Sequence, residues 1–242
     1  MPLPRVFING WAMPACAPAT LLECLPSAAD SIIHLSDLVS PGDITLNTLL
    51  AALRQKMPEP PCLLMGWSYG GMLACAYAAR FPQRVKALVT LAMNPCFVAQ
   101  AHWQAGMATD VFEQFVRRFS THPEKTRKQF IALCCMGGAN ETHQRRQLMA
   151  EMPLATDGLL PLLKLFGALD IRPLMTRVQC PVTHIYGEQD AVVPVAVSTL
   201  MEAHYPWHRT ERMAGSHCFF MDNPKSVSYL MARRHKEVAS PC

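Results

Sequence analysis

Three residues of this 242-residue chain have the types and order of a hydrolytic triad: Ser68, Asp190 and His217. Ser68 is the centre of Gly66-Trp67-Ser68-Tyr69-Gly70, a G-x-S-x-G pattern that stands between an apolar run and an alanine-rich run. This pattern predicts a sharp turn from a strand into a helix, which projects the serine hydroxyl above the edge of a sheet. A serine hydroxyl is a weak nucleophile, so this chemistry needs a histidine base and a carboxylate that orients the histidine.

The candidate base is His217, which alone among the nine histidines sits in a glycine-containing loop directly after a late predicted strand. By contrast, His34 and His184 fall inside predicted strands, and we expect His204 and His208 at helix ends or on the surface. The order serine, acid, histidine is the one found in hydrolases with this kind of turn. We therefore assign the role of general base to His217.

The candidate acid is Asp190, which ends the strand that precedes the histidine loop and has the right rank in the chain. Glu188, two residues earlier, and Asp170 are weaker alternatives. Cys218 stands beside the histidine but lacks the turn that a nucleophile needs, so we interpret it as a packing residue. The sequence thus favours Asp190 as the residue that orients the base.

Two backbone N–H groups are expected to form the oxyanion hole. One belongs to Tyr69, the residue after the nucleophile, and the other comes from the loop after an earlier strand. Trp11 lies where the second donor is needed, because Asn9-Gly10-Trp11 follows the apolar run of residues 6–8. Its indole could also form a wall of the acyl pocket.

The rest of the chain alternates between strand and helix patterns, which predicts an α/β fold with a mostly parallel sheet. The alternation stops over residues 98–174, where four helical patterns follow one another. We expect residues 1–97 and 175–242 to form the core and residues 98–174 to form an inserted helical lid over the serine. The predicted strands are residues 6–8, 31–35, 62–65, 85–91, 181–186 and 209–213; the predicted lid helices are residues 110–119, 123–134, 142–152 and 159–169.

Composition narrows the class of protein. Half of the residues are hydrophobic and 17% are charged, which suits a globular core, and the net charge of +4 is mild. No signal-peptide order, no apolar run of membrane-helix length and no C-x-x-C pair occur, so we expect a cytoplasmic protein with reduced thiols and no membrane partner. No metal-ligand pattern, nucleotide-binding loop or nucleic-acid recognition pattern is present, and we expect no cofactor. We also expect a monomer.

One segment of the lid has a higher net positive charge than the whole chain. Between residues 117 and 146 there are seven basic and two acidic residues. Exposed helices often carry such charges only as a solvated face. A positive lid would nevertheless attract an acidic substrate or an acidic carrier protein.

With these residues in place, the chain resembles the α/β-hydrolase superfamily over nearly its whole length. Four segments together resemble the pimeloyl-[acyl-carrier protein] methyl ester esterases of biotin synthesis. These segments are residues 66–71 (GWSYGG), 9–11 (NGW), 94–97 (NPCF) and 130–137 (FIALCCMG).

The resemblance implies hydrolysis of the methyl ester of a pimeloyl chain that an acyl-carrier protein holds on phosphopantetheine. Trp11, Phe97 and Phe130 would line the acyl channel. Basic lid residues would bind the acidic carrier, and they correspond here to Lys125, Arg127, Lys128, Arg145 and Arg146.

This chain departs from the family pattern at several positions. Asn9 stands where the family has histidine before the glycine and tryptophan, which leaves the backbone donor intact but changes how the loop is held. Gln129 and Thr142 stand where the family has arginines that bind the carrier. The first strand here also corresponds to what is usually the third, so we expect the antiparallel edge pair to be absent.

Two other functions are compatible with these residues. The chain could be a generalist esterase, lipase or thioesterase for small acyl compounds, with the basic lid as ordinary surface. It could also be a non-catalytic binding protein on a hydrolase scaffold, although a complete triad argues against this. Fold alone does not decide the substrate.

Overall fold

A computed structural model of the chain describes residues 3–25, 30–40, 42–152 and 158–239, with side chains described up to residue 231. Its centre is a six-stranded sheet in which every pairing is parallel and the spatial order is β2-β1-β3-β4-β5-β6. In chain order the strands are β1 (Arg5–Ile8), β2 (Asp30–Ile33), β3 (Cys62–Trp67), β4 (Val85–Leu91), β5 (Val182–Gly187) and β6 (Arg209–Met213). The described sheet therefore has no antiparallel pair, as the sequence predicts.

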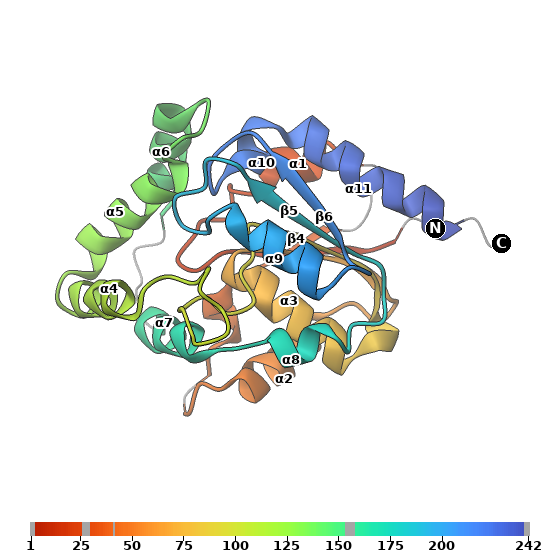
Figure 1. The fold of residues 1–242 in the computed structure, drawn as a ribbon, viewed down its shortest axis with the longest axis horizontal. Coiled ribbons are helices and arrows are strands. Elements are labelled where there is room, and N and C mark those ends of the chain that lie inside the picture. The colour runs from red at the N-terminus through yellow and green to blue at the C-terminus, as the bar shows by residue number, and fades with distance from the viewer. Residues whose placement is uncertain (1–2, 26–29, 41, 153–157, 240–242) are drawn as a thin grey trace.

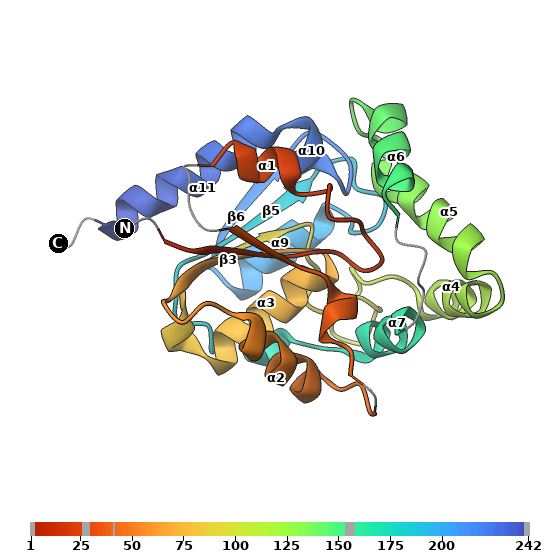
Figure 2. The ribbon, with the colours of Figure 1, turned by 180° about the vertical axis from the view of Figure 1, so that it is seen from behind.

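Helices cover both faces of the sheet, because the crossover connections between parallel strands place them there. Strands β1, β3 and β5 are buried along their whole length, and such continuous apolar runs are typical of a parallel sheet. In chain order the helices are α1 (Ala19–Glu23), α2 (Leu46–Lys56), α3 (Tyr69–Arg80), α4 (Thr109–Thr121), α5 (Pro123–Cys135), α6 (Glu141–Ala150), α7 (Leu159–Ala168), α8 (Arg172–Met175), α9 (Ala196–His204), α10 (Phe219–Asp222) and α11 (Pro224–Ala239). Helices α1, α10 and α11 lie on one face, while α2 and α3 lie on the other (Figures 1 and 2).

Helix α3 is buried against the sheet. Its residues 69–79 are all buried, and it contacts β1, β3 and β4. Alanines at positions 74, 76, 78 and 79 leave room for this close approach, because a larger side chain would hold the helix away from the sheet. The helix that follows the predicted nucleophile is therefore fixed against three strands.

Helices α4, α5, α6 and α7 come between β4 and β5 in the chain and lie together beyond one end of the sheet (Figures 1 and 2). The sequence places four helices here, and the structure has them within a few residues of the expected bounds. The division into a core and a lid at residues 98 and 174 remains a prediction. The position of the helices at the sheet's end is compatible with it.

Nine cysteines lie in the described part of the chain, and all nine are free thiols. Seven are buried, and burial raises the pKa of several of them, to about 12 for Cys62 and about 11 for Cys180. Cys62 and Cys180 therefore stay protonated at neutral pH and behave as small apolar side chains. Across the described residues, no helix combines the length and apolarity that a membrane span requires.

A buried histidine pair lies between the sheet and the loop before β6. His184 in β5 is opposite Thr90 in β4, and its Nδ1 is 2.6 Å from the threonine hydroxyl. Its Nε2 is 3.1 Å from Nδ1 of His208, which is 6% exposed. The expectation that His208 lies at a helix end or on the surface is therefore wrong as to exposure, because the ring stacks on Tyr205 and turns inward.

We predict that this pair makes the fold sensitive to acid. Burial, and secondarily His208, lowers the pKa of His184 well below its usual value near 6.5. Below pH 6.5 the unfolded chain binds a proton at this residue that the folded chain does not, so the free energy of unfolding falls as pH falls, by at most about 1.4 kcal/mol per pH unit for one histidine. Urea unfolding between pH 7.5 and 5 should show a shallower decline in His184→Gln, which keeps polar atoms but does not titrate. Equal pH slopes for the two proteins would contradict this account.

Candidate active site

Ser68 occupies the turn between β3 and α3 with a backbone conformation that few residues adopt. Its φ is 56° and its ψ is −121°, outside the regions that side chains normally tolerate. Its N–H donates to the carbonyl of Leu91 at 2.8 Å, which ties the turn to the end of β4. The conformation predicted from the G-x-S-x-G pattern is therefore the one observed.

The two outer glycines allow this turn because backbone approaches backbone there. A Cβ at Gly66 would collide with the carbonyl of Gly70, and a Cβ at Gly70 would collide with the carbonyl of Ile8 at the end of β1. Backbone atoms of a central strand have little room to move, so any side chain at these positions would displace the turn. Ser68 consequently lies where β1, β3 and α3 meet.

Two other non-glycine residues in the described part of the chain share the positive φ of Ser68. In the described part of the chain, the non-glycine residues with positive φ are Ala12, Ser68 and Ala92. They follow β1, β3 and β4, so all three lie near the carboxyl edge of adjacent strands. Strained residues persist only where the surroundings hold them, and they concentrate at functional sites.

Asp190 and His217 meet in the interior of the protein. Nδ1 of His217 is 2.7 Å from Oδ2 of Asp190, and both side chains are almost completely buried. The other carboxylate oxygen accepts hydrogen bonds from the N–H groups of Val192 and Val193, at 2.7 and 2.8 Å. The carboxylate is thereby fixed in position and can hold the imidazole with Nε2 facing away from it.

The predicted nucleophile and base are not hydrogen-bonded to each other. Nε2 of His217 is buried, and no hydrogen-bond partner for it is found among the described residues. The histidine loop still touches the serine turn, since Trp67 donates from Nε1 to the His217 carbonyl at 3.0 Å and the two rings are 5.6 Å apart. Hydrogen bonds between catalytic groups often form only when substrate binds, so this arrangement does not exclude the assigned roles.

The two alternative acids, Asp170 and Glu188, have other surroundings. Asp170 forms an ion pair with Arg172, with oxygens 2.6 and 2.8 Å from the guanidinium nitrogens, and Glu188 is exposed. Burial raises the pKa of Cys218 well above its ordinary value, so this thiol is protonated. Of the candidate acids, Asp190 is the one in contact with His217.

The loop that carries Trp11 is held by the side chain of Asn9, which is fully buried. Its amide nitrogen donates to the carbonyls of Met13 and Pro14, at 3.2 and 2.7 Å, and its oxygen accepts from the N–H of Gly10 at 3.0 Å. Within the described part of the chain, the backbone N–H groups of Trp11 and Tyr69 donate no hydrogen bond. Both predicted oxyanion donors are therefore available to a ligand.

A cavity of about 330 Å³ opens beside Ser68. Its walls include Trp11, Phe97 and Phe130, the three residues that the resemblance implies for acyl binding. Helices α4, α5 and α7 supply most of the remaining lining, so the inserted helices form one side of the cavity. The structure thus brings the predicted nucleophile and the predicted acyl-binding residues together.

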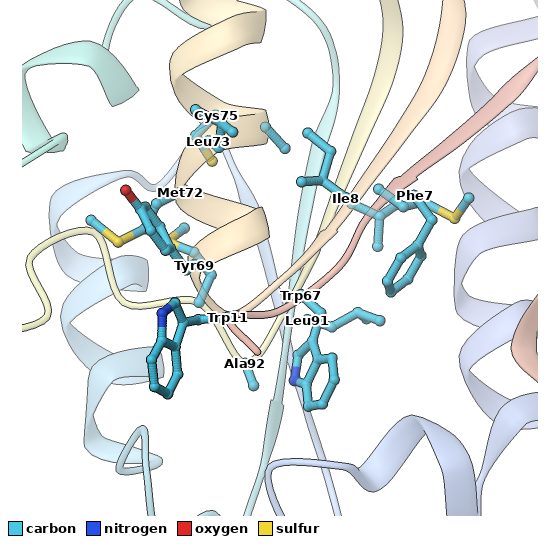
Figure 3. Close-up of a cluster of buried hydrophobic side chains, with 14 of the residues drawn as sticks. Phe7, Ile8, Trp11, Trp67, Tyr69, Met72, Leu73, Cys75, Leu91 and Ala92 are labelled. Atoms are coloured by element: carbon cyan, nitrogen blue, oxygen red, sulfur yellow. The ribbon is translucent and has the colours of Figure 1, made fainter. Parts of the chain in front are cut away.

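Aromatic packing fixes the position of Trp11. Its ring makes edge contacts with Phe115, Phe119 and Phe130, at centroid distances of 5.8, 5.0 and 5.5 Å. Its Nε1 donates to the Leu159 carbonyl at 2.9 Å. Figure 3 shows the indoles of Trp11 and Trp67 on either side of the strand ends.

The basic residues of the lid do not share one environment. Lys125, Lys128, Arg145 and Arg146 are exposed, and Lys128 pairs with Glu124. Arg127 is only 1% exposed, which does not fit the expectation that it binds a carrier protein together with the other four. The sequence contains the reason, because Arg127, Ile131 and Cys134 are spaced along one face of α5 and all three are buried.

Two interactions that hold Asp190 and the His217 loop in place were not predicted from the sequence. The amides of Val192 and Val193 that bind Asp190 are backbone groups, which no residue pattern marks. Trp67 is recognisable as part of the elbow pattern, but its bond to the His217 loop joins residues 150 positions apart.

In the described residues, no cluster of histidine, cysteine and acidic side chains suits a metal ion.

The chain is similar to known proteins over most of its length. The pattern of the alpha/beta hydrolase fold family matches residues 36–224. The biotin biosynthesis bifunctional protein BioHC of Cellvibrio japonicus is 32% identical over 92% of this chain, which spans 45% of that protein. The pimeloyl-[acyl-carrier protein] methyl ester esterase of Aeromonas hydrophila is 30% identical, with 91% of this chain and 90% of the relative aligned.

Among solved structures, a bromoperoxidase from Bacillus anthracis superposes with a TM-score of 0.84, covering 98% of this chain and 92% of the other, at 18% identity. That likeness concerns the fold alone. The family match covers most of the chain and includes both the serine turn and the Asp190–His217 pair. The chain belongs to the alpha/beta hydrolase fold family.

Proposed function

We propose that this chain is a serine carboxylesterase that hydrolyses the methyl ester of a pimeloyl chain held on acyl-carrier protein, in biotin synthesis. The observation that carries the hydrolytic part is the buried Asp190–His217 hydrogen bond next to the strained Ser68 turn. Relatives named as pimeloyl-[acyl-carrier protein] methyl ester esterases support the substrate.

In the first step, Oγ of Ser68 attacks the ester carbonyl and its proton passes to Nε2 of His217. This nitrogen is buried and has no hydrogen-bond partner among the described residues, so it is free to accept a hydrogen bond from the serine hydroxyl. Asp190 holds the opposite nitrogen and stabilises the imidazolium that forms. The negative charge develops on the carbonyl oxygen, where the N–H groups of Trp11 and Tyr69 stabilise it.

In the second step, the tetrahedral intermediate collapses and the bond to the methoxy group breaks. His217 gives its proton to the departing methanol, which leaves an acyl group on Ser68. A water molecule then attacks this acyl-enzyme while His217 takes its proton. The bond between the acyl group and Ser68 breaks, His217 returns the proton to the serine oxygen, and the product leaves with a free carboxylate. The chain's own residues supply every proton acceptor and donor that this cycle needs.

The substrate assignment has support from the shape of the site. The cavity beside Ser68 is lined largely by aromatic and aliphatic side chains, which suits a methylene chain. On the outer face of α5, Lys125 and Lys128 border a shallow depression that shares Gln129 with the cavity. An acidic carrier docked there would stand at the entrance to the acyl channel.

The cellular setting that we infer is the cytoplasm. Nine unpaired thiols in the described residues are typical of a reducing compartment.

We predict that Ser68→Ala lowers kcat for methyl ester hydrolysis by about 10⁴-fold or more, because the nucleophile itself is removed. Labelling by a fluorophosphonate probe should disappear in the same variant. Ser120→Ala, which changes an exposed serine on α4, serves as the matched control and should retain both properties. Retention of full turnover in Ser68→Ala would show that the nucleophile lies elsewhere.

We predict that Asn9→Ala lowers kcat by about tenfold with little change in KM. The loop loses the bonds that position the Trp11 donor, and loss of a whole oxyanion donor costs roughly 10²- to 10³-fold. Asn9→His, which restores a ring N–H donor, should recover part of the rate. If Asn9→Ala keeps the wild-type kcat while its melting temperature falls, the side chain supports only stability.

We predict that charge reversal at Lys125, Lys128, Arg145 and Arg146 raises KM for the carrier-bound ester without changing hydrolysis of a small free ester. These side chains are exposed and remote from the serine, so they act on docking and on the rate of encounter. Lys56→Glu and Lys225→Glu, which reverse exposed charges outside the lid, provide the control. Equal losses on both substrates would argue against carrier docking at this face.

A further inference from the structure

The cavity beside Ser68 is almost uncharged. Of the described residues that line it, Arg118 alone carries a charge, and no carboxylate contributes to the lining. A single guanidinium in otherwise apolar and amide-bearing walls gives the cavity a defined positive end. That charge is independent of the catalytic chemistry proposed above, which needs only Ser68, His217, Asp190 and two backbone donors.

Arg118 lies at the opening of the cavity, away from the serine. Ser68 is 7% exposed and Trp11 is 3% exposed, so they form the inner end. Arg118, Gln114 and Gln129 are exposed lining residues, so they form a rim with three polar side chains. A ligand that fills the cavity from Ser68 outward therefore ends among donor groups, one of them charged.

No carboxylate in the described part of the chain neutralises the charge of Arg118. Its neighbour Arg117 pairs with Glu113 at 3.5 Å, and Lys128 across the rim pairs with Glu124 at 2.5 Å. Arg118 forms no ion pair with any described carboxylate. Its planar guanidinium is suited to a carboxylate or a phosphate, which it can bind through two parallel hydrogen bonds.

We propose that Arg118 is a substrate-binding residue that holds the anionic group at the far end of an acyl ester whose carbonyl lies at Ser68. The anion is a carboxylate when the substrate is a free half-ester, or a phosphodiester when the chain hangs from a pantetheine arm. This inference rests on the proposed esterase function. It adds a preference for esters that are neutral at the reacting end and negative at the other.

Such a contact acts on binding and orientation. Energy from a remote part of the substrate positions the ester against the nucleophile, so its loss appears mainly in KM or Kd. An ion pair at a partly exposed rim corresponds to a change of about fivefold in affinity. The effect should weaken as salt is raised, because exposed charges are screened.

The test compares monomethyl pimelate, which is negative at one end, with dimethyl pimelate, which is neutral at both. Their Kd values are measured on proteins that also carry Ser68→Ala, so that binding is read without turnover. Arg118→Gln should weaken binding of the half-ester about fivefold and change binding of the diester less than twofold. Arg118→Lys should keep most of the affinity. Arg117→Gln removes an adjacent arginine that does not line the cavity, and it should change neither ligand.

Turnover of the methyl ester loaded on acyl-carrier protein then identifies the source of the anion. A rise in KM on this substrate alone in Arg118→Gln assigns the residue to the phosphodiester, and weaker binding of the half-ester alone assigns it to the carboxylate. If Arg118→Gln leaves both the half-ester preference and the carrier-bound KM at wild-type values, the inference is overturned. If the wild-type protein hydrolyses no ester, the proposed function fails, while the two Kd values still decide the role of Arg118.

Discussion

The close approach of α3 to the ends of β1 and β3 is the constraint on which the site depends. It forces Ser68 into a conformation that costs about 1–3 kcal/mol, a cost that only a rigid setting can support. The setting here is a fully parallel sheet with a helix buried along one face, and two glycines let the backbones meet. The serine is thus positioned by the most deeply packed part of the molecule, and its hydroxyl needs no flexible loop to reach the cavity.

The second requirement of the site is a carboxylate, that of Asp190, which is stabilised in the protein interior. A buried carboxylate is costly unless hydrogen bonds replace its water. Asp190 has three such bonds, from two adjacent amides and from His217, so its position is fixed before substrate arrives. The histidine loop is in turn anchored by Trp67, the residue next to the nucleophile. The Asp190–His217 pair is therefore linked to the serine turn through the side chain of Trp67.

The sequence was sufficient to predict the order of strands and helices and the contact of Asp190 with His217, because these depend on local patterns and on chain order. It failed where exposure depends on which face of an element turns inward. His208 follows a helix in a polar segment, yet it stacks on Tyr205 and is buried. Arg127 stands among exposed lysines, and its burial follows from helical spacing with Ile131, a pattern that net charge conceals. A run of charged residues in a helix must therefore be compared with the helical period before its members are assigned to the surface.

Arg127 also indicates how the inserted helices are held. Its Nε and Nη2 have no hydrogen-bond partner among the described residues, and burial lowers the pKa of the guanidinium. Burial of a guanidinium carries a desolvation cost, which works against packing of α5 on the core. The opposing contribution comes from the aromatic contacts of Trp11 with Phe119 on α4 and Phe130 on α5. The tryptophan that we propose as an oxyanion donor thus also anchors the helices that line the cavity, so under this proposal one residue links substrate enclosure to oxyanion geometry.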